Sequence, residues 1–151
     1  MERTLVLIKP SGVQRGLVGH ILSRFESRGL KIVGLKMMQI DEALAREHYR
    51  DHVDKHFFDM LLQRITKSHV VAIVFEGSNV IQNVRTMMGA TNPSQAGPGT
   101  IRGDLANSAS LNLVHGSDSP ESAAREIALF FADTELHNYE RALDEWLVLE
   151  E

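Results

Sequence analysis

Residues 69–75 are almost wholly apolar, and this run restricts the possible folds more than any other part of the sequence. A short continuous run of apolar and partly β-branched residues is typical of a strand that is buried on both faces. Three further apolar runs, at residues 4–9, 30–40 and 110–114, predict neighbouring strands. We therefore expect a four-stranded sheet in which residues 69–75 take a central position.

Apolar residues at helical spacing predict helices between and after these strands. The predicted helices cover residues 19–28, 42–49, 58–65, 80–88 and 120–131. The predicted N-caps are Asp41 for helix 42–49, Ser78 or Asn79 for helix 80–88, and Ser119 for the last helix, where Pro120 takes the first helical position. Gly29 and Gly89 are predicted to end the helices that precede them. This order of elements predicts an α+β fold of the split βαβ, ferredoxin-like type, in which a four-stranded antiparallel sheet carries its helices on one side.

The segment from residue 90 to residue 109 has a different composition. It contains glycines and prolines, shows no periodicity and is too long for a simple connection, so we interpret it as a functional loop that carries Thr91 and Arg102. The tail, with Trp146 and Leu149, is expected to pack as an extension. Without internal repeats or a low-complexity linker, residues 1–151 are expected to form a single domain.

The composition limits the classes of function. Sixteen Lys and Arg against twenty Asp and Glu give a net charge of −4, which argues against a protein that coats nucleic acid. There is no cysteine, so disulfides and thiolate metal sites are excluded. The N-terminus shows no signal-peptide pattern, and no apolar run is long enough to span a bilayer. We expect a cytoplasmic protein that binds neither a membrane nor a specific nucleic acid.

His115 lies between an apolar strand and the helix that Ser119 caps. A free imidazole has a pKa of about 6.5, so a ring nitrogen is available near pH 7 as a nucleophile, a base or a ligand. The start of the following helix favours an anion such as phosphate. Glu126 leans toward that helix start, and it could orient the ring together with Ser117.

Two other patterns invite a functional interpretation that we set aside. His48, His52 and His56 recur at a spacing that would align them on one helix as metal ligands. We expect the helix to break near residues 53–54, and no HExxH arrangement is present, so no protein metal site is predicted. Residues 102–104 read Arg-Gly-Asp, an adhesion motif that has no use in the cytosol.

Three positive side chains are spread along the chain. Lys9 is the last residue of a predicted strand, Arg85 lies beside a helix stripe and Arg102 belongs to the long loop. Each alone is an ordinary surface charge, but together they could clamp phosphates, because arginine binds phosphate in bidentate fashion and lysine binds it as a point charge. The sequence contains no P-loop and no protein-kinase catalytic loop, so any phosphoryl transfer must use another design.

Asn112-x-x-His115-Gly116-Ser117-Asp118 resembles the active-site signature of the nucleoside diphosphate kinases. Residues 9–19 (Lys-Pro-Ser-Gly-Val-Gln-Arg-Gly-Leu-Val-Gly) are similar to the N-terminal motif of that family. Further matching blocks follow in the family's order at residues 48–49, 57–58, 76–77, 85–93 and 98–104. Many separated blocks in one order are far more specific than a single motif, and they extend over nearly the whole chain.

This resemblance implies a two-step phosphoryl relay. His115 would take the γ-phosphoryl group of a nucleoside triphosphate, mainly ATP, on the ring nitrogen nearer its Cβ and pass it to a nucleoside diphosphate. Glu126 and Ser117 would orient His115. The nucleotide would be held by Lys9, Tyr49, Arg85, Thr91 and Arg102 at its phosphates and ribose, by Asn112 at the 3′-hydroxyl and by Phe57 at the base.

The resemblance also implies Mg²⁺ bound through the nucleotide phosphates, tolerance of different bases and sugars, and a homo-oligomer, either a hexamer or a tetramer. A rival hypothesis is a nucleotide-binding or phosphohistidine-relay module that regulates and hardly turns over. The sequence departs from the family pattern at Ser11, His56 and Ser68-His69, where Asp, Pro and Gly-Pro are usual. None of these departures removes a group assigned to the chemistry, and Ser11 can still cap the turn that follows.

Overall fold

The structure is a computed structural model, and it describes residues 1–147. Its centre is a four-stranded sheet in the order β2-β3-β1-β4, and every neighbouring pair of strands is antiparallel. The strands are β1 (Glu2–Ile8), β2 (Lys31–Met38), β3 (Val70–Gly77) and β4 (Val114–Gly116). The predicted ferredoxin-like sheet is thus confirmed, and β3 lies between two other strands, as the apolar run predicted.

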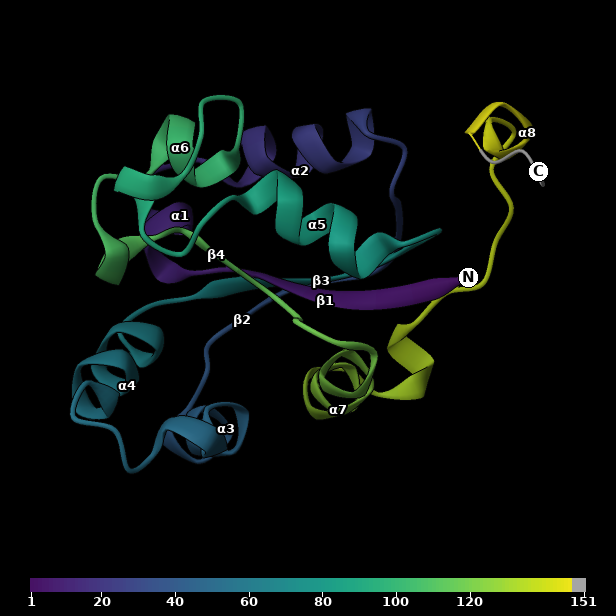
Figure 1. Cartoon of the computed structure of the whole chain (residues 1–151). Coiled ribbons are helices and arrows are strands. Elements are labelled where there is room, and N and C mark those ends of the chain that lie inside the picture. Colours follow the sequence, from purple (N-terminus) through teal and green to yellow (C-terminus); the bar gives the residue numbers. More distant parts are fainter. Residues whose placement is uncertain (148–151) are drawn as a thin grey trace.

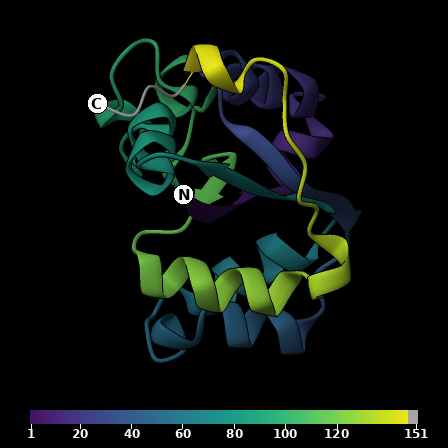
Figure 2. The ribbon, with the colours of Figure 1, turned by 90° about the vertical axis from the view of Figure 1, so that its right-hand side faces the viewer.

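Helices cover both faces of this sheet (Figures 1 and 2). On one face lie α1 (Pro10–Gln14), α2 (Val18–Ser27), α5 (Val80–Met88) and α6 (Ile101–Leu105). On the other face lie α3 (Glu42–His48), α4 (Phe58–Thr66) and α7 (Pro120–Phe130). The prediction of helices on one side was therefore wrong.

The alternation of side chains along β1 explains the two helical layers. Val6 and Ile8 belong to the core beneath α2 and α5, whereas Leu5 and Leu7 belong to the core on the opposite face. All four side chains are fully buried. Successive residues of a strand point to opposite faces, so a strand that is apolar at every position needs cover on both.

The fourth strand begins later than predicted. Residues Ala109–Leu111 form a 3-10 turn, and Leu113 has φ +73, a left-handed backbone conformation that a strand cannot contain. The strand therefore covers Val114–Gly116 instead of residues 110–114, and His115 lies within it, paired with Leu7 of β1. A buried leucine in this conformation is strained by about 1–3 kcal/mol, and it lies beside the signature residues.

Several helix boundaries follow the predicted local signals. Asp41 accepts a hydrogen bond from the Leu44 amide at 2.8 Å, and Ser119 accepts one from the Ser122 amide at 3.1 Å. Asn79 occupies the N-cap position of α5, but its φ of 51 gives no side-chain cap. The prediction that Ser11 caps the turn that follows it was wrong, because Ser11 lies inside α1. Lys9 takes the N-cap position of α1, without a hydrogen bond from its side chain.

The segment from residue 90 to residue 109 is more ordered than its composition predicted. It contains a 3-10 turn, Pro93–Gln95, and the helix α6, which Thr100 caps by accepting a hydrogen bond from the Gly103 amide at 3.0 Å. The remaining 3-10 turns cover Arg50–His52 and Asp133–Glu135.

The chain continues into α8 (Asp144–Leu147), whose Leu147 side chain lies against Gly29. Trp146 is 78% exposed, so the expected packing of this side chain was wrong. Leu149 lies outside the described residues. Within residues 1–147, no helix is both long enough and apolar enough to cross a membrane.

Candidate active site

A cleft of about 600 Å³ opens where β4 leaves the sheet and faces α3, α4 and α7. Nine of the ten site residues predicted from the sequence line it: Lys9, Tyr49, Phe57, Arg85, Thr91, Arg102, Asn112, His115 and Glu126. The tenth, Ser117, is fully buried behind Glu126. These residues come from almost every part of the chain, and the fold gathers them at one place.

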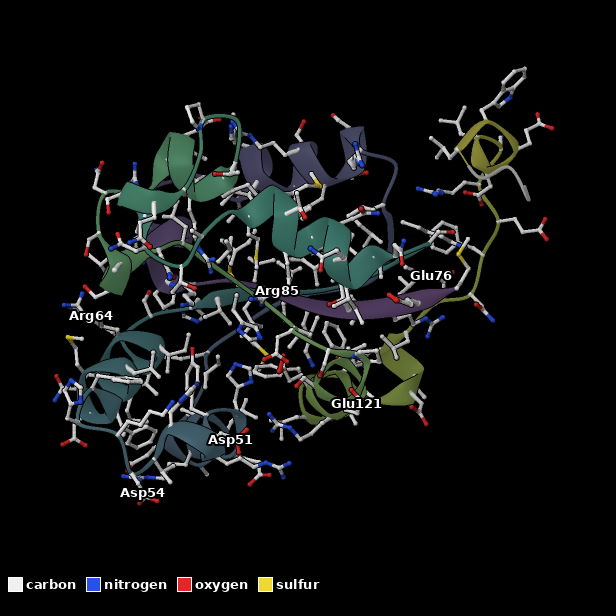
Figure 3. All side chains as sticks on the ribbon, in the orientation of Figure 1. Asp51, Asp54, Arg64, Glu76, Arg85 and Glu121 are labelled. Carbon is white, nitrogen blue, oxygen red and sulfur yellow. The ribbon has the colours of Figure 1, made fainter. Side chains whose placement is uncertain are left out.

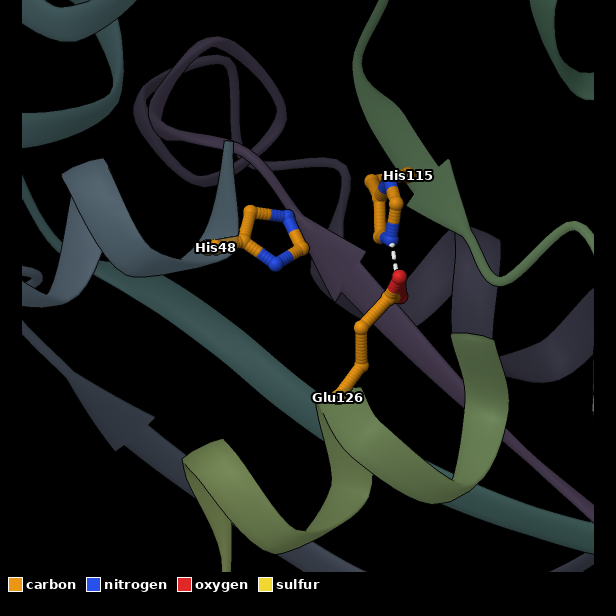
Figure 4. A group of neighbouring side chains, drawn as sticks. All are labelled: His48, His115 and Glu126. Carbon is orange, nitrogen blue, oxygen red and sulfur yellow. Dashed lines mark hydrogen bonds and ion pairs between the residues drawn. The ribbon is translucent and has the colours of Figure 1, made fainter. Parts of the chain in front are cut away.

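The side chains of His115 and Glu126 are in close polar contact in the cleft. The Nε2 atom of His115 lies 2.6 Å from Oε1 of Glu126 (Figure 4). The hydroxyl of Ser117 donates to the same carboxylate oxygen at 2.9 Å and accepts from the Leu5 amide at 3.3 Å. Glu126 is therefore anchored through Ser117 to the first strand, and it fixes the imidazole in turn.

This arrangement determines which nitrogen of His115 can react. A carboxylate accepts hydrogen bonds, so the proton of the neutral ring lies on Nε2, and the lone pair lies on Nδ1. The His115 side chain is 22% exposed, whereas that of Glu126 is 6% exposed. The partly exposed ring therefore has its nucleophilic nitrogen on the side away from the buried carboxylate.

Lys9, Asn112 and the backbone at Thr91 form a second group. The Lys9 ammonium donates to Oδ1 of Asn112 at 2.9 Å, and Nδ2 of Asn112 donates to the Thr91 carbonyl at 3.1 Å. Burial lowers the pKa of Lys9 to about 8, with a smaller contribution from the positive charge of Arg102. An anion in the cleft would favour the charged form of this lysine.

Arg102 is held differently from a surface arginine. Its Nε, Nη1 and Nη2 atoms donate to the carbonyls of Asn112, Gly89 and Val114 at 3.2, 3.0 and 2.7 Å. Burial and the charge of Arg85 lower its pKa to about 10. A guanidinium has five N–H groups, so two remain for a ligand after these three bonds.

Arg85 reaches the site from α5. Its side chain lies next to β4, and Nη1 donates to the Gly116 carbonyl at 3.4 Å (Figure 3). The residue is exposed and has one long hydrogen bond, so its guanidinium is free to turn toward a phosphate. Arg85 and Arg102 thus bring positive charge to His115 from two elements.

Tyr49 and Phe57 supply aromatic surface. The hydroxyl of Tyr49 is buried without a hydrogen-bond partner among the described residues. Burial raises the pKa of Tyr49, and the negative charge of Glu126 raises it further. Phe57 is half-buried at the start of α4, with the ammonium of Lys55 5.7 Å from its ring centroid. An aromatic ring in the lining of a cleft suits a nucleotide base.

Sequence reasoning missed His48 as part of this site. Its ring packs edge-on against that of His115, with centroids 4.7 Å apart, and it also contacts Tyr49. Neither ring nitrogen has a hydrogen-bond partner in the described structure. Burial, helped by the neighbouring His115, holds the pKa of His48 far below its usual value. The sequence signal was the His48-Tyr49 pair, which belongs to a matching family block.

Further polar residues that were not among the ten predicted site residues line the cleft, namely Asp51, His52, Arg64, Asp118, Ser122 and Arg125. Asp118 is the most informative of them, since it ends the His115 signature. The pKa of Asp118 lies below its usual range, mainly because the Ser122 side chain forms a hydrogen bond with the Asp118 carboxylate. Asp51, in the 3-10 turn after α3, and Arg64, in α4, come from the side of the cleft that these two helices form (Figure 3).

Comparison with known proteins identifies the family of the chain. The family model described as nucleoside diphosphate kinase matches residues 2–136. The chain belongs to the nucleoside diphosphate kinase family. It is 60% identical to a nucleoside diphosphate kinase from Carboxydothermus hydrogenoformans over 147 residues, which cover 97% of this chain and 99% of that protein. A relative in Natronomonas pharaonis is 58% identical and matches 97% of this chain and 96% of its own.

The fold agrees with that of solved nucleoside diphosphate kinases. A halophilic nucleoside diphosphate kinase from Halobacterium salinarum, solved in complex with CDP, matches with a TM-score of 0.96 and 52% identity. This match covers 98% of the present chain and 99% of the other. A family protein from Babesia bovis matches with a TM-score of 0.95 at 42% identity, over 98% and 100% of the two chains.

Proposed function

We propose that the chain transfers the γ-phosphoryl group of a nucleoside triphosphate, mainly ATP, to nucleoside diphosphates by way of a phosphohistidine on His115. Full-length similarity to nucleoside diphosphate kinases supports the overall reaction. The observation that carries the mechanism is the 2.6 Å contact between Nε2 of His115 and Glu126. It keeps Nε2 protonated and leaves Nδ1 as the nucleophile.

In the first half-reaction, the Nδ1 lone pair attacks the γ-phosphorus and the bond to the β–γ bridging oxygen breaks. Glu126 stabilises the positive charge that develops on the ring, and Ser117 holds Glu126 in place. The nucleoside diphosphate then leaves, and a second one attacks the phosphohistidine through its terminal oxygen. The same residues serve both half-reactions, as a ping-pong mechanism requires.

The other site residues position the nucleotide in this proposal. Lys9, Tyr49, Arg85, Thr91 and Arg102 bind phosphates and ribose, Asn112 meets the 3′-hydroxyl, and Phe57 stacks on the base. Phosphoryl transfer depends mainly on in-line positioning and neutralisation of charge. The two remaining N–H groups of Arg102 and the exposed guanidinium of Arg85 are suited to that purpose.

Magnesium is proposed to arrive with the nucleotide. Mg²⁺ favours an octahedral shell of oxygen ligands. In residues 1–147, the group of potential metal ligands at the site combines two histidines with one carboxylate, which does not fit Mg²⁺. When bound to the phosphates, the ion would supply charge neutralisation, and the protein supplies the nucleophile, the orienting carboxylate and the cationic side chains.

The phosphoenzyme intermediate can be tested directly. The protein is incubated with γ-labelled ATP and Mg²⁺, freed of nucleotide and then chased with GDP. We expect label that is labile in acid and stable in base, and its quantitative transfer to GTP. Label that GDP cannot discharge would favour the regulatory-module hypothesis.

We predict that the site tolerates all common bases, because an aromatic face stacks on any of them. The Phe57→Ala variant is expected to lose about 1–3 kcal/mol of binding free energy for ADP, GDP, CDP and UDP alike. The measurement is kcat/KM for the four diphosphates in both proteins. A wild-type enzyme that phosphorylates GDP well but CDP and UDP hardly at all would contradict the prediction.

Nucleotide affinity is predicted to fall as the pH rises above 8. Burial lowers the pKa of Lys9 to about 8, so Lys9 is charged below that pH and becomes neutral above it. A bound phosphate favours the charged form, and ADP should bind up to about tenfold more weakly at pH 9 than at pH 7. Calorimetric titration with ADP measures this change.

The matched control is Lys9→Arg, because arginine stays charged over this range. Its ADP affinity should be nearly independent of pH, whatever its absolute value. An equally steep decline in the variant would assign the titration to another group.

We further propose a homo-oligomer, a hexamer or a tetramer, and a cytoplasmic protein of one domain. The outer edge of β2 supports self-association, since Leu35 and Met37 are 50% and 61% exposed on it. An apolar edge strand offers unpaired backbone groups to a second copy. Light scattering on the purified protein distinguishes the two assemblies.

A further inference from the structure

Beyond the kinase reaction, the group formed by His48, His115 and Glu126 has the composition of a transition-metal site. One ligand atom from each residue lies within 4.8 Å of those from the other two (Figure 4). Two imidazole nitrogens and a carboxylate oxygen form a ligand set typical of Zn²⁺ sites that keep an open position. They come from α3, β4 and α7, three elements that the core holds together.

His48 supplies an independent reason to expect a ligand here. The residue is only 5% exposed, and both of its ring nitrogens are buried without a partner among the described residues. Buried polar atoms are nearly always hydrogen-bonded, so an orphaned imidazole beside two other ligand groups calls for an explanation.

We propose that Zn²⁺ binds between His48, His115 and Glu126 and thereby inhibits the enzyme by blocking phosphorylation of His115. This inference rests on the proposed function, because it assumes that Nδ1 of His115 is the phosphoryl acceptor. The borderline-soft ion would be distinct from the Mg²⁺ that accompanies the nucleotide.

The inhibition follows from the two nitrogens of one ring. Zn²⁺ takes the Nε2 lone pair of His115, so the proton on Nε2 leaves and a proton from solvent occupies Nδ1. Protonated Nδ1 has no lone pair for the γ-phosphorus. Conversely, attack by Nδ1 of the ring that carries its proton on Nε2 gives a phosphohistidine that keeps this proton, and an Nε2 that donates to Glu126 has no lone pair for the metal. Metal binding at Nε2 and phosphorylation at Nδ1 are therefore mutually exclusive.

The geometry requires a small rearrangement. In a tetrahedral zinc site with bonds of about 2.0–2.1 Å, neighbouring ligand atoms lie about 3.4 Å apart. The Nε2–Oε1 contact must therefore open from 2.6 Å, while His48 moves toward the pair. The positive charges of Lys9 and Arg125, which both act on His48, oppose the ion. We accordingly expect moderate affinity, with a Kd of about micromolar order.

The test is equilibrium binding of ZnCl₂ to the full-length, nucleotide-free protein, measured by competition with a chelating dye. We expect one ion per subunit in the wild type and an affinity at least about tenfold lower in His48→Phe. Phenylalanine keeps a similar ring volume and removes both unpartnered nitrogens, so the variant should fold. The matched control is His69→Phe, whose exposed histidine lies elsewhere and whose zinc affinity should equal that of the wild type.

A second measurement compares the unphosphorylated and phosphorylated wild-type enzymes. With CoCl₂ as a spectroscopic probe, we expect the visible absorption of a tetrahedral site only in the unphosphorylated form. Equal zinc affinity of wild type and His48→Phe, equal cobalt spectra of the two forms, or no wild-type binding below about 1 mM would each overturn the proposal. Absence of a phosphoenzyme would instead refute the proposed function, and the comparison of variants would still test the metal site.

Discussion

The His115→Ala variant is expected to lose nucleoside diphosphate kinase activity by about four orders of magnitude or more. Alanine removes the only group proposed to carry the phosphoryl between the two nucleotides. Nucleotide binding should persist, since the residues proposed to hold the phosphates and the base are unchanged. Steady-state transfer from ATP to GDP, together with calorimetric binding of ADP, measures the two effects separately.

The folded state of this variant should be close to that of the wild type. His115 is partly exposed, and Glu126 keeps its hydrogen bond from Ser117. An exposed histidine, His69, provides the control, because His69→Ala should retain full activity. Acid-labile label in His115→Ala would transfer the role of nucleophile to another residue.

The Arg102→Ala variant is expected to lose both stability and nucleotide affinity. Arg102 donates to three backbone carbonyls that join the segment after α5 to β4. The Asn112 carbonyl still accepts from the Val114 amide at 2.9 Å, so the variant leaves the carbonyls of Gly89 and Val114 without their donor. Leaving a buried acceptor unpaired costs about 1–3 kcal/mol, so the two amount to about 2 kcal/mol or more. In a domain of this size, each 1 kcal/mol corresponds to about 2–4 °C in Tm, which gives a decrease of about 4–8 °C.

Arg85→Ala is the matched comparison. Arg85 is exposed and makes one hydrogen bond of 3.4 Å, so its loss should weaken ADP binding without a measurable change in Tm. Thermal unfolding and ADP titration of both variants, at one protein concentration, separate the two arginines. An unchanged Tm in Arg102→Ala would contradict the structural role that its three hydrogen bonds give it.

The elements with strong local signals could be predicted from the sequence. The apolar run in β3 and the caps at Asp41 and Ser119 lie where the sequence placed them. The start of β4 could not be predicted, because the left-handed backbone at Leu113 is imposed by its surroundings and not by leucine. The second helical layer was missed because an apolar run does not tell how its two faces are covered.

The site was predicted from motifs, and the motifs name residues without describing their contacts. Arg102 was expected as a phosphate ligand, and nothing in the sequence indicated that three of its N–H groups are already bound to backbone. His48 was considered for a metal site with His52 and His56, neighbours along the helix. The structure instead brings it against His115 from a distant element, a contact that depends on tertiary packing.

The anchoring of the site to β1 has a consequence for how the protein folds. The Ser117 amide donates to the Leu5 carbonyl, and Lys9 donates to Asn112, in both cases across more than a hundred residues of sequence. Contacts of such high sequence separation are slow to form. A nascent chain has no functional site until β4 and α7 have been synthesised and have docked on its first strand. During refolding, recovered catalysis should therefore lag behind the helical signal and report the last long-range contacts.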